Sequence, residues 1–593
     1  MPAPQPAASG SDGDAAESLD VNIRTGLLRR RSSPSSDSNH HHPRKATTAP
    51  LTRLNGLAVV ISLQIGSGIF STPSLISRLV SSPAQALLVF ILAGLLVWTG
   101  AASFVELGQR VPANGGIQEY LRASWGEWAG YGFAWIWVGV AKPAGNAVIA
   151  RIFADYFLGA LKALLVLGKE GKNGEVEALM AMSTSKLVAL ACVAFLTIIN
   201  CLGARAGAKA ANVFLFLKLA ALGSIIAIGL SILLFGHGAG VPSSKEGWFG
   251  ARPPYSKPGQ QQQQHHHQQV SNDVTTDLWT WLGNFSNAAF AALFCYGGWE
   301  TVGFFAGDMK NPAKDLPVII NGAMTLVIIG FFLMNVALYV CLPFNVIRES
   351  TTVAVEFAKQ TIGIWGGLVF SLVVAVSAMG AINANMFTTA KLAVAASQRA
   401  YFPAILANLH CGTARDEAAY FDRTLPSTSW WLVPLRWSAK CIARLTRELR
   451  WENSVPFFAL LLNGVLTSVF VLVGTFSGLI NLIEMTKALC YMMSVLGLFS
   501  LRRADKLNHP TGTRHNNQQN RHDNQHQYDH PRHRTWSGNP IIFASVSGLL
   551  ILRGAVSEPL QGPSILFLGV LGLAALYRRF TNGSRGYEIS SPV

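Results

Sequence analysis

The sequence predicts an all-α polytopic membrane protein with twelve transmembrane helices. Of its 593 residues 50% are hydrophobic and only 13% are charged, and the apolar residues stand in long runs with the charges between them and in the tails. Soluble domains usually carry roughly a quarter charged residues, so this chain has too few charges to cover a soluble surface of its size. Runs of about 20 apolar residues match the thickness of a bilayer core instead.

The candidate spans are these apolar runs, taken in chain order. They are Leu54–Ser77, Ala84–Val105, Trp128–Ala160, Leu187–Ala204, Ala211–Leu234, Trp279–Gly307, Leu316–Cys341, Trp365–Ser397, Phe457–Phe476, Leu479–Leu501, Asn539–Leu552 and Gly562–Tyr577. The first ten spans are expected to form two repeats of five, so that spans one and six occupy corresponding positions.

Composition divides the rest of the chain. The N-terminal tail is rich in Ser, Pro, Ala and Asp and has no apolar segment, so we expect disorder and no cleaved signal peptide. A Gln- and His-rich loop follows span five, and its histidines are expected to be a solvated insert and no metal site. The predicted units are a disordered cytoplasmic tail (1–52), the first repeat (53–235), a low-complexity external loop (236–278), the second repeat (279–501), a disordered cytoplasmic loop (502–537), spans eleven and twelve (538–578) and a cytoplasmic tail (579–593).

The charges of the loops predict how the chain is oriented in the membrane. An even number of spans places both termini on one side, and the segments on that side hold 31 of the 47 Lys and Arg residues, against 11 on the other side. Because positive loops stay in the cytoplasm, both termini are predicted to be cytoplasmic.

Span one contains a helix break. Ile65-Gly66-Ser67-Gly68-Ile69 is followed by Pro73, and two glycines with a proline weaken a helix where lipid cannot satisfy the freed backbone groups. Such a break is stable where it lines a cavity or is buried in protein. The half-helix after it would offer unpaired N–H groups and a positive dipole end, which suit a carboxylate. Close helix packing through small residues is the alternative.

Span six carries a second glycine pair, Gly297-Gly298, between Phe294 and Glu300. Paired glycine-interrupted spans in matching positions point to a transporter substrate site. Carbonyl groups released at the second break would accept hydrogen bonds from an ammonium group. The two breaks together therefore favour a zwitterionic amino acid as the ligand over coincidental packing glycines.

Several charges fall inside the predicted spans. Lys218 lies in mid-span among apolar neighbours, so a cation-site or proton-carrying role is the default hypothesis. Lys142-Pro143 predicts a local kink in span three. Arg151 and Asp155, spaced i, i+4, predict a structural ion pair. Glu300 and Glu484 are expected either to relay protons or to pair with a buried lysine.

Motifs in spans one to ten match a known family. They are Gly66-Ser67-Gly68-Ile69-Phe70, Glu106-Leu107-Gly108, Gly115-Gly116, Lys142-Pro143, Tyr296-Gly297-Gly298-Trp299-Glu300, Met309-Lys310-Asn311-Pro312 and, in span eight, Asn383 with Phe387-Thr388. With these motifs the chain resembles the L-type amino acid transporters of the amino acid–polyamine–organocation superfamily, and most of all their fungal methionine-permease branch.

The resemblance implies a leucine-transporter-type fold, with the 5+5 repeats inverted and two extra helices. It implies carboxylate binding by the backbone of Gly66, Ser67 and Gly68, with Ile69 in the same motif. Amine binding falls to carbonyl groups of Ile65 and of span six near Phe294, which stands at the aromatic gate. Gly297 would admit large side chains, and Lys218 replaces a sodium ion in this family.

Two departures from the family qualify this expectation. Glu300 stands where animal members usually have Asn, which affects substrate range and proton coupling. The loop 161–186 has no cysteine, whereas animal members use one there for a disulfide to a glycoprotein heavy chain. No disulfide-linked heavy chain is therefore expected.

The sequence thus predicts a secondary transporter that imports neutral amino acids, methionine first, by alternating access and with proton symport. Obligate exchange of large neutral amino acids and a non-transporting amino acid sensor are the alternatives. No enzyme activity, cofactor, metal or nucleic-acid partner is expected. The expected location is the plasma membrane, or an internal membrane, in contact with anionic lipid and with cytoplasmic lysines open to ubiquitin.

Overall fold

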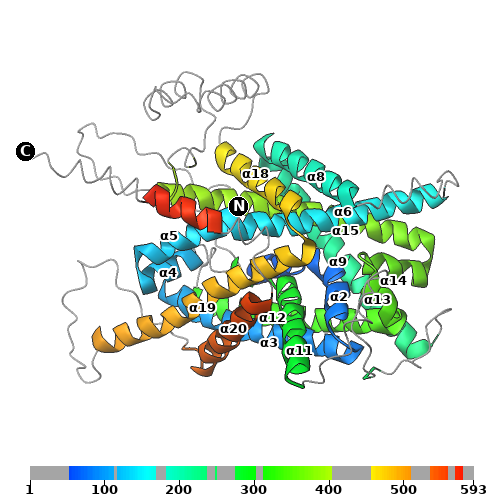
Figure 1. Cartoon of the computed structure of the whole chain (residues 1–593), viewed down its shortest axis with the longest axis horizontal. Coiled ribbons are helices and arrows are strands. Elements are labelled where there is room, and N and C mark those ends of the chain that lie inside the picture. The colour runs from blue at the N-terminus through cyan, green and yellow to red at the C-terminus, as the bar shows by residue number, and fades with distance from the viewer. Residues whose placement is uncertain are drawn as a thin grey trace, which may run out of the picture.

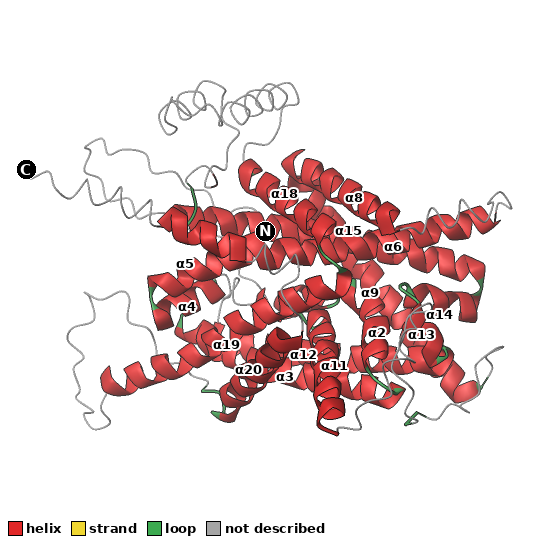
Figure 2. Cartoon of the chain, in the orientation of Figure 1, coloured by secondary structure: helices red, strands yellow, loops and turns green. Residues whose placement is uncertain are grey.

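The computed structural model describes residues 53–111, 116–167, 182–202, 204–236, 248–249, 274–301, 312–403, 406, 456–508, 534–557 and 568–578. Within these ranges the regular structure is helical and contains no strand (Figure 2). The rest of the chain, including the predicted tails and most of the two long loops, lies outside the described residues.

The helices follow one another with short connections in most of the described ranges. They are α1 (Arg53–Gln64), α2 (Gly68–Leu79), α3 (Pro83–Arg110), α4 (Ile117–Trp125), α5 (Glu127–Ile136), the π-helical turn η1 (Trp137–Ala141), α6 (Lys142–Leu167), α8 (Met182–Leu202), α9 (Ala204–Phe235), α11 (Val274–Cys295), α12 (Pro312–Cys341), α13 (Phe344–Glu349), α14 (Val353–Ile362), α15 (Ile364–Gln398), α18 (Phe457–Val473), α19 (Phe476–Asn508) and α20 (Gly538–Ser557). A further apolar helix covers Leu568–Arg578.

Among the described residues, six helices are long and apolar enough to cross a membrane. They lie at Pro83–Arg110, Ser183–Cys201, Phe216–Phe235, Lys314–Cys341, Ile364–Ser397 and Phe476–Ala504. Three shorter apolar helices (Phe457–Val473, Gly538–Arg553 and Leu568–Arg578) coincide with predicted spans nine, eleven and twelve. The multi-pass helical architecture is therefore present, while the count of twelve spans and the inverted 5+5 repeat stay predictions.

Both glycine-rich breaks are present where the sequence predicts them. The first broken helix consists of α1 and α2, which are separated by the non-helical residues 65–67. The second break follows α11, where a turn at 296–298 leads into a short 3₁₀ segment at 299–301. Gly298 has φ 108°, a backbone conformation that favours glycine because it lacks a Cβ atom.

The predicted kink in span three takes the form of a π-helical turn. The helix runs from α5 through η1 into α6, and Pro143 is the second residue after the turn. A proline removes a hydrogen-bond donor and clashes with the carbonyl one turn earlier, so the wider turn before it accommodates the ring.

Two long helices form the centre of the fold. α6 and α15 pack along each other and run across the molecule (Figure 1). α18 and α8 pack on α6, whereas α12 packs on α3 and on α9. α19 packs on α20, α4, α6 and α11, so it connects the centre of the fold with the second broken helix.

The two halves of the first broken helix are held differently. α2 is tied at several buried points: Tyr156 Oη donates to the Phe70 carbonyl (2.8 Å), Thr72 Oγ1 shares a hydrogen bond with Cys295 Sγ (2.6 Å), and Ser77 Oγ shares one with Tyr339 Oη (2.9 Å). α1 packs on α12, where Arg53 pairs with Asp315 at 2.5 Å. The Arg53 side chain is 58% exposed in that pair.

A buried polar network joins α3, α19 and the residues before α20. The Glu106 carboxylate accepts two hydrogen bonds from Arg502, at 2.9 and 2.5 Å, and two from the backbone and hydroxyl of Thr535. This network corrects one predicted boundary. The segment 502–537 begins as helix, since α19 continues to Asn508 with Arg502 anchored in the core.

Candidate functional site

The first break leaves several backbone donors free. The N–H of Ile65 donates to the Ile61 carbonyl (2.8 Å) and that of Gly66 to the Gln64 carbonyl (2.9 Å). Among the described residues no acceptor takes up the N–H groups of 67–69 at the start of α2. The first N–H groups of a helix carry its positive dipole end, so this position suits an anion such as a carboxylate. The donors are Ser67, Gly68 and Ile69, because the Gly66 N–H is already bonded.

The second break leaves carbonyl groups free. The Gly297 N–H donates to the Phe294 carbonyl (3.3 Å), and the Thr301 N–H donates to the Gly298 carbonyl (3.2 Å). Within 274–301 and the other described ranges, no backbone N–H donates to the carbonyls of 295–297. These oxygens are available to an ammonium group. The predicted site residue Glu300 is 2% exposed and accepts a hydrogen bond from the Gly298 N–H (2.8 Å), so its carboxylate caps the turn.

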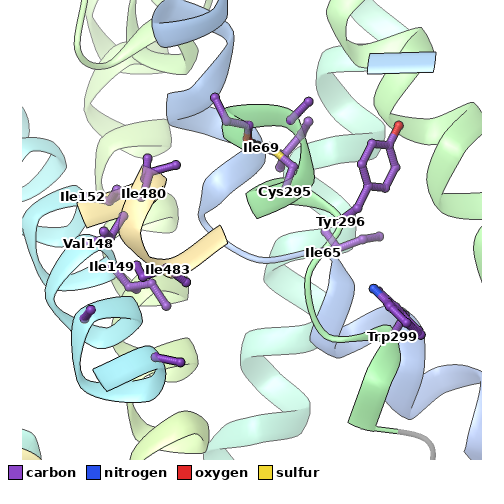
Figure 3. Packing of buried hydrophobic residues seen from close by; sticks show 14 of the residues in the cluster. Ile65, Ile69, Val148, Ile149, Ile152, Cys295, Tyr296, Trp299, Ile480 and Ile483 are labelled. Carbon is purple, nitrogen blue, oxygen red and sulfur yellow. Dashed lines mark hydrogen bonds between the residues drawn. The ribbon is translucent and has the colours of Figure 1, made fainter. Parts of the chain in front are cut away.

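The two breaks lie against each other. A methyl group placed on the Gly68 α-carbon would lie 3.1 and 3.2 Å from two ring carbons of Phe294, so this ring packs directly on the start of α2. In Figure 3 the segment at Ile65 passes close to the turn that carries Tyr296, and Ile69 lies beside Cys295. At Gly66, by contrast, an added methyl group would meet nothing closer than the backbone N of Gly68 at 3.9 Å, so space is open there.

A group of buried and half-buried charged side chains lies beside the second break. Lys487 and Glu484 of α19 form an ion pair at 2.7 Å. The Lys487 ammonium lies 5.6 Å from the centre of the Phe294 ring, and a methyl group on Gly297 would lie 3.2 Å from its Nζ atom. Lys487 therefore stands directly over the second break. Glutamate–lysine pairing was one of the two roles expected for Glu484, and the structure confirms it.

Lys142 of α6 belongs to the same group. Its Nζ atom lies 5.6 Å from the Trp137 ring, and it interacts electrostatically with Glu300 and Lys487. The group is called the charge cluster below; it comprises Lys142, Glu300, Glu484 and Lys487. With two lysines and two glutamates, the formal net charge of the cluster is zero.

Apolar and aromatic side chains enclose this region. Trp299 packs edge-on against Phe104 (ring centres 4.8 Å apart) and Tyr491 (5.1 Å). Opposite the breaks, α6 and α19 bring together a set of branched side chains (Figure 3), namely Val148, Ile149, Ile152, Ile480 and Ile483. A few polar groups in an apolar surround are typical of small-molecule sites.

Three further charged residues of the predicted spans, Lys218, Arg151 and Asp155, are not part of the charge cluster. Lys218 is buried in α9, which packs on α12 and α15, and no hydrogen bond joins it to the first break within the described residues. The predicted Arg151–Asp155 ion pair is wrong. The Asp155 carboxylate instead accepts a hydrogen bond from Ser185 Oγ of α8 (2.7 Å), and in the part of the chain that is described the Arg151 Nε and Nη1 atoms have no hydrogen-bond partner.

Lys487 is the site residue that the sequence did not single out. Its signal was present, because Glu484 and Lys487 are spaced i, i+3 on one helix face. Only the packing of α19 against α11 places that helix face over the second break.

Comparison with known proteins identifies the family of the chain. Residues 51–565 match the amino acid permease family. The chain is 25% identical over 545 residues to b(0,+)-type amino acid transporter 1 of Mus musculus, covering 91% of this chain and 90% of that protein. It is 24% identical to the Homo sapiens protein of the same name, with 96% of each chain covered. Large neutral amino acids transporter small subunit 2 of Mus musculus is 27% identical over 357 residues, 60% of each chain.

Proposed function

The chain belongs to the amino acid permease family, and on that premise we propose that it is a secondary transporter that imports neutral amino acids, methionine first among them, by alternating access and with proton symport. The observation that carries the proposal is the facing pair of helix breaks. One break presents free N–H groups and the other presents free carbonyl groups, which together match the carboxylate and the ammonium of a zwitterionic amino acid.

In the proposed binding mode, the substrate carboxylate accepts hydrogen bonds from the N–H groups of Ser67, Gly68 and Ile69. The substrate ammonium donates to the carbonyl groups at 295–297 and to that of Ile65. The substrate side chain extends over Gly297 toward the Lys487 ammonium, which lies 3.2 Å from the place of a Cβ on that glycine, and Phe294 covers the bound amino acid. Release of these contacts on one side of the membrane and then on the other gives alternating access.

Two buried groups are the candidates for coupling. Lys218 supplies a fixed positive charge where a cation would otherwise be needed, so no sodium dependence is expected. Glu300 caps the second break, because its side chain accepts a hydrogen bond from the Gly298 N–H. Protonation of Glu300 would weaken that hydrogen bond and so link proton binding to the shape of the substrate site.

Competition uptake tests the proposal. Cells that lack endogenous amino acid permeases express the chain, and uptake of radiolabelled methionine is measured at two pH values against an excess of each other amino acid. We expect saturable methionine uptake that is faster at the lower pH, unaffected by sodium and inhibited by large neutral amino acids.

The same cells distinguish the alternatives. Uptake that requires a preloaded amino acid inside the cell and is insensitive to pH would indicate obligate exchange. Binding without accumulation would indicate a sensor. Absence of both binding and uptake for all amino acids would refute the proposal.

The proposal extends to assembly and location. Because the loop 161–186 has no cysteine, the transporter is expected to work without a disulfide-linked heavy chain, at the plasma membrane with both termini in the cytoplasm. Expression without any added subunit, followed by labelling of cysteine tags at each terminus in intact and in permeabilised cells, tests both statements.

A further inference from the structure

We infer that Lys487 sets the charge class of the substrate, by excluding amino acids with cationic side chains. The inference rests on the proposed substrate position and deepens it. It assigns to a residue of α19 the selection of neutral side chains over cationic ones.

The first step is the position of the ammonium group. Lys487 Nζ is 3.2 Å from the place that a methyl group on Gly297 would occupy, and it lies over the Phe294 ring at 5.6 Å. In the proposed binding mode the substrate side chain passes over Gly297. A side chain that passes over Gly297 therefore comes near Lys487 Nζ.

The second step is charge balance. In the charge cluster Lys487 is paired with Glu484 at 2.7 Å and interacts electrostatically with Glu300, while Lys142 faces Glu300 and Lys487 from α6. With two positive and two negative groups, a neutral substrate leaves the buried region uncharged. A cationic side chain adds an unpaired positive charge, which is costly where water is largely excluded.

The third step explains why Lys487 would exclude cationic side chains without attracting acidic ones. The Lys487 ammonium is already neutralised by Glu484 at hydrogen-bonding distance, so an acidic side chain would have to displace an existing carboxylate. Replacing Lys487 by a neutral residue, by contrast, leaves Glu484 and Glu300 with one excess negative charge. The altered site then attracts a cation.

The experiment compares matched variants in permease-deficient cells and as purified protein. Lys487→Gln removes the positive charge at similar length. Glu484→Gln removes the negative partner and leaves an excess positive charge. The double variant restores a net charge of zero. Lys359→Gln is the matched control, because Lys359 forms an i, i+3 pair with Glu356 of α14 at 3.0 Å but is 39% exposed and outside the site.

Surface expression, uptake of methionine and arginine, and binding of both amino acids by the thermal shift of the purified protein are measured for each variant. We expect Lys487→Gln to raise the ratio of arginine to methionine uptake at least tenfold, with arginine uptake inhibited by methionine. Glu484→Gln, the double variant and Lys359→Gln should show no gain in arginine uptake.

A folded Lys487→Gln protein that binds methionine but neither binds nor transports arginine would overturn the inference. An equal gain of arginine uptake in Glu484→Gln would also overturn it, since the cause would then be a loosened site. The thermal shift measures which of the two amino acids a variant binds, even where that variant no longer transports. Loss of the proposed function is recognised separately, as wild-type protein that neither binds nor accumulates any amino acid.

Discussion

Replacement of Gly68 by alanine gives the sharpest test of the packing between the two helix breaks. The new methyl group would lie 3.1 and 3.2 Å from two ring carbons of Phe294 and 3.7 Å from the Cys295 α-carbon. Carbon atoms in favourable contact are about 3.5–4.0 Å apart, so the ring must retreat by several tenths of an ångström. The ring moves against packed neighbours, because the Lys487 ammonium lies 5.6 Å from its centre and the next residue, Cys295, is hydrogen-bonded to Thr72.

Overpacking of this kind costs about 1–3 kcal/mol. If the cost falls on the closed, substrate-bound state, it corresponds to a loss of roughly 5- to 150-fold in transport at low substrate concentration, since 1.4 kcal/mol is about tenfold. The assay is methionine uptake per molecule at the cell surface, with the thermal midpoint of the purified protein recorded in parallel. Shrinking the ring should relieve the clash, so Gly68→Ala should cost less in a Phe294→Leu background than alone.

The comparison variant is Gly66→Ala, where the nearest atom to the added methyl group is 3.9 Å away. It should leave the thermal midpoint unchanged, so any loss of uptake arises from the space offered to the substrate. Additive effects of Gly68→Ala and Phe294→Leu, within about 0.5 kcal/mol, would refute the contact with Phe294 as the cause.

Three further predictions concern Lys218, Gly298 and the Glu106–Arg502 pair. Lys218→Ala should reduce methionine uptake at least tenfold or make it depend on sodium, and uptake like that of the wild type in both respects would remove this charge from the cycle. Gly298→Ala places a side chain at φ 108°, which costs about 1–3 kcal/mol and should lower the thermal midpoint. Gly132→Ala is the control and should not lower it, because its added methyl group meets nothing within 4 Å. Glu106→Gln leaves a buried arginine without its anionic partner and should destabilise the fold by about 3–5 kcal/mol, measured by thermal unfolding in detergent; equal midpoints for wild type and variant would contradict this account.

The helix breaks were the most predictable part of the site. Glycine pairs and a nearby proline weaken a helix locally, and in a membrane such a weakness has few structural solutions. Residues 65–67 and 296–298 are accordingly non-helical, as the sequence predicts. What the sequence could not give was the detailed use of the backbone. The Gly66 N–H, expected to bind a carboxylate, bonds instead to the Gln64 carbonyl.

Side-chain pairing was predictable only where both partners lie on one helix face and no other helix competes. Glu484 and Lys487 form the expected kind of pair. Arg151 and Asp155 have an equally favourable spacing, but Ser185 of α8 supplies a hydrogen bond to Asp155. An ion pair between residues spaced i, i+4 on a helix contributes only a few tenths of a kcal/mol, so a contact from a neighbouring helix readily outweighs it.

The unequal attachment of α1 and α2 has a kinetic consequence. To swing α2, several buried hydrogen bonds must break together, each worth about 0.5–1.5 kcal/mol. Among the described contacts α1 is held by its packing on α12, by one buried hydrogen bond from Gln64 Nε2 to Met324 Sδ (3.1 Å) and by one ion pair whose arginine is largely exposed. Exposed pairs of this kind contribute about 0–1 kcal/mol. The barrier for opening the half of the molecule that contains α1 is therefore the lower one. If the N-terminus is cytoplasmic, as proposed, the bound amino acid would escape inward faster than outward, while the proposed coupled gradient alone would set how far accumulation can proceed.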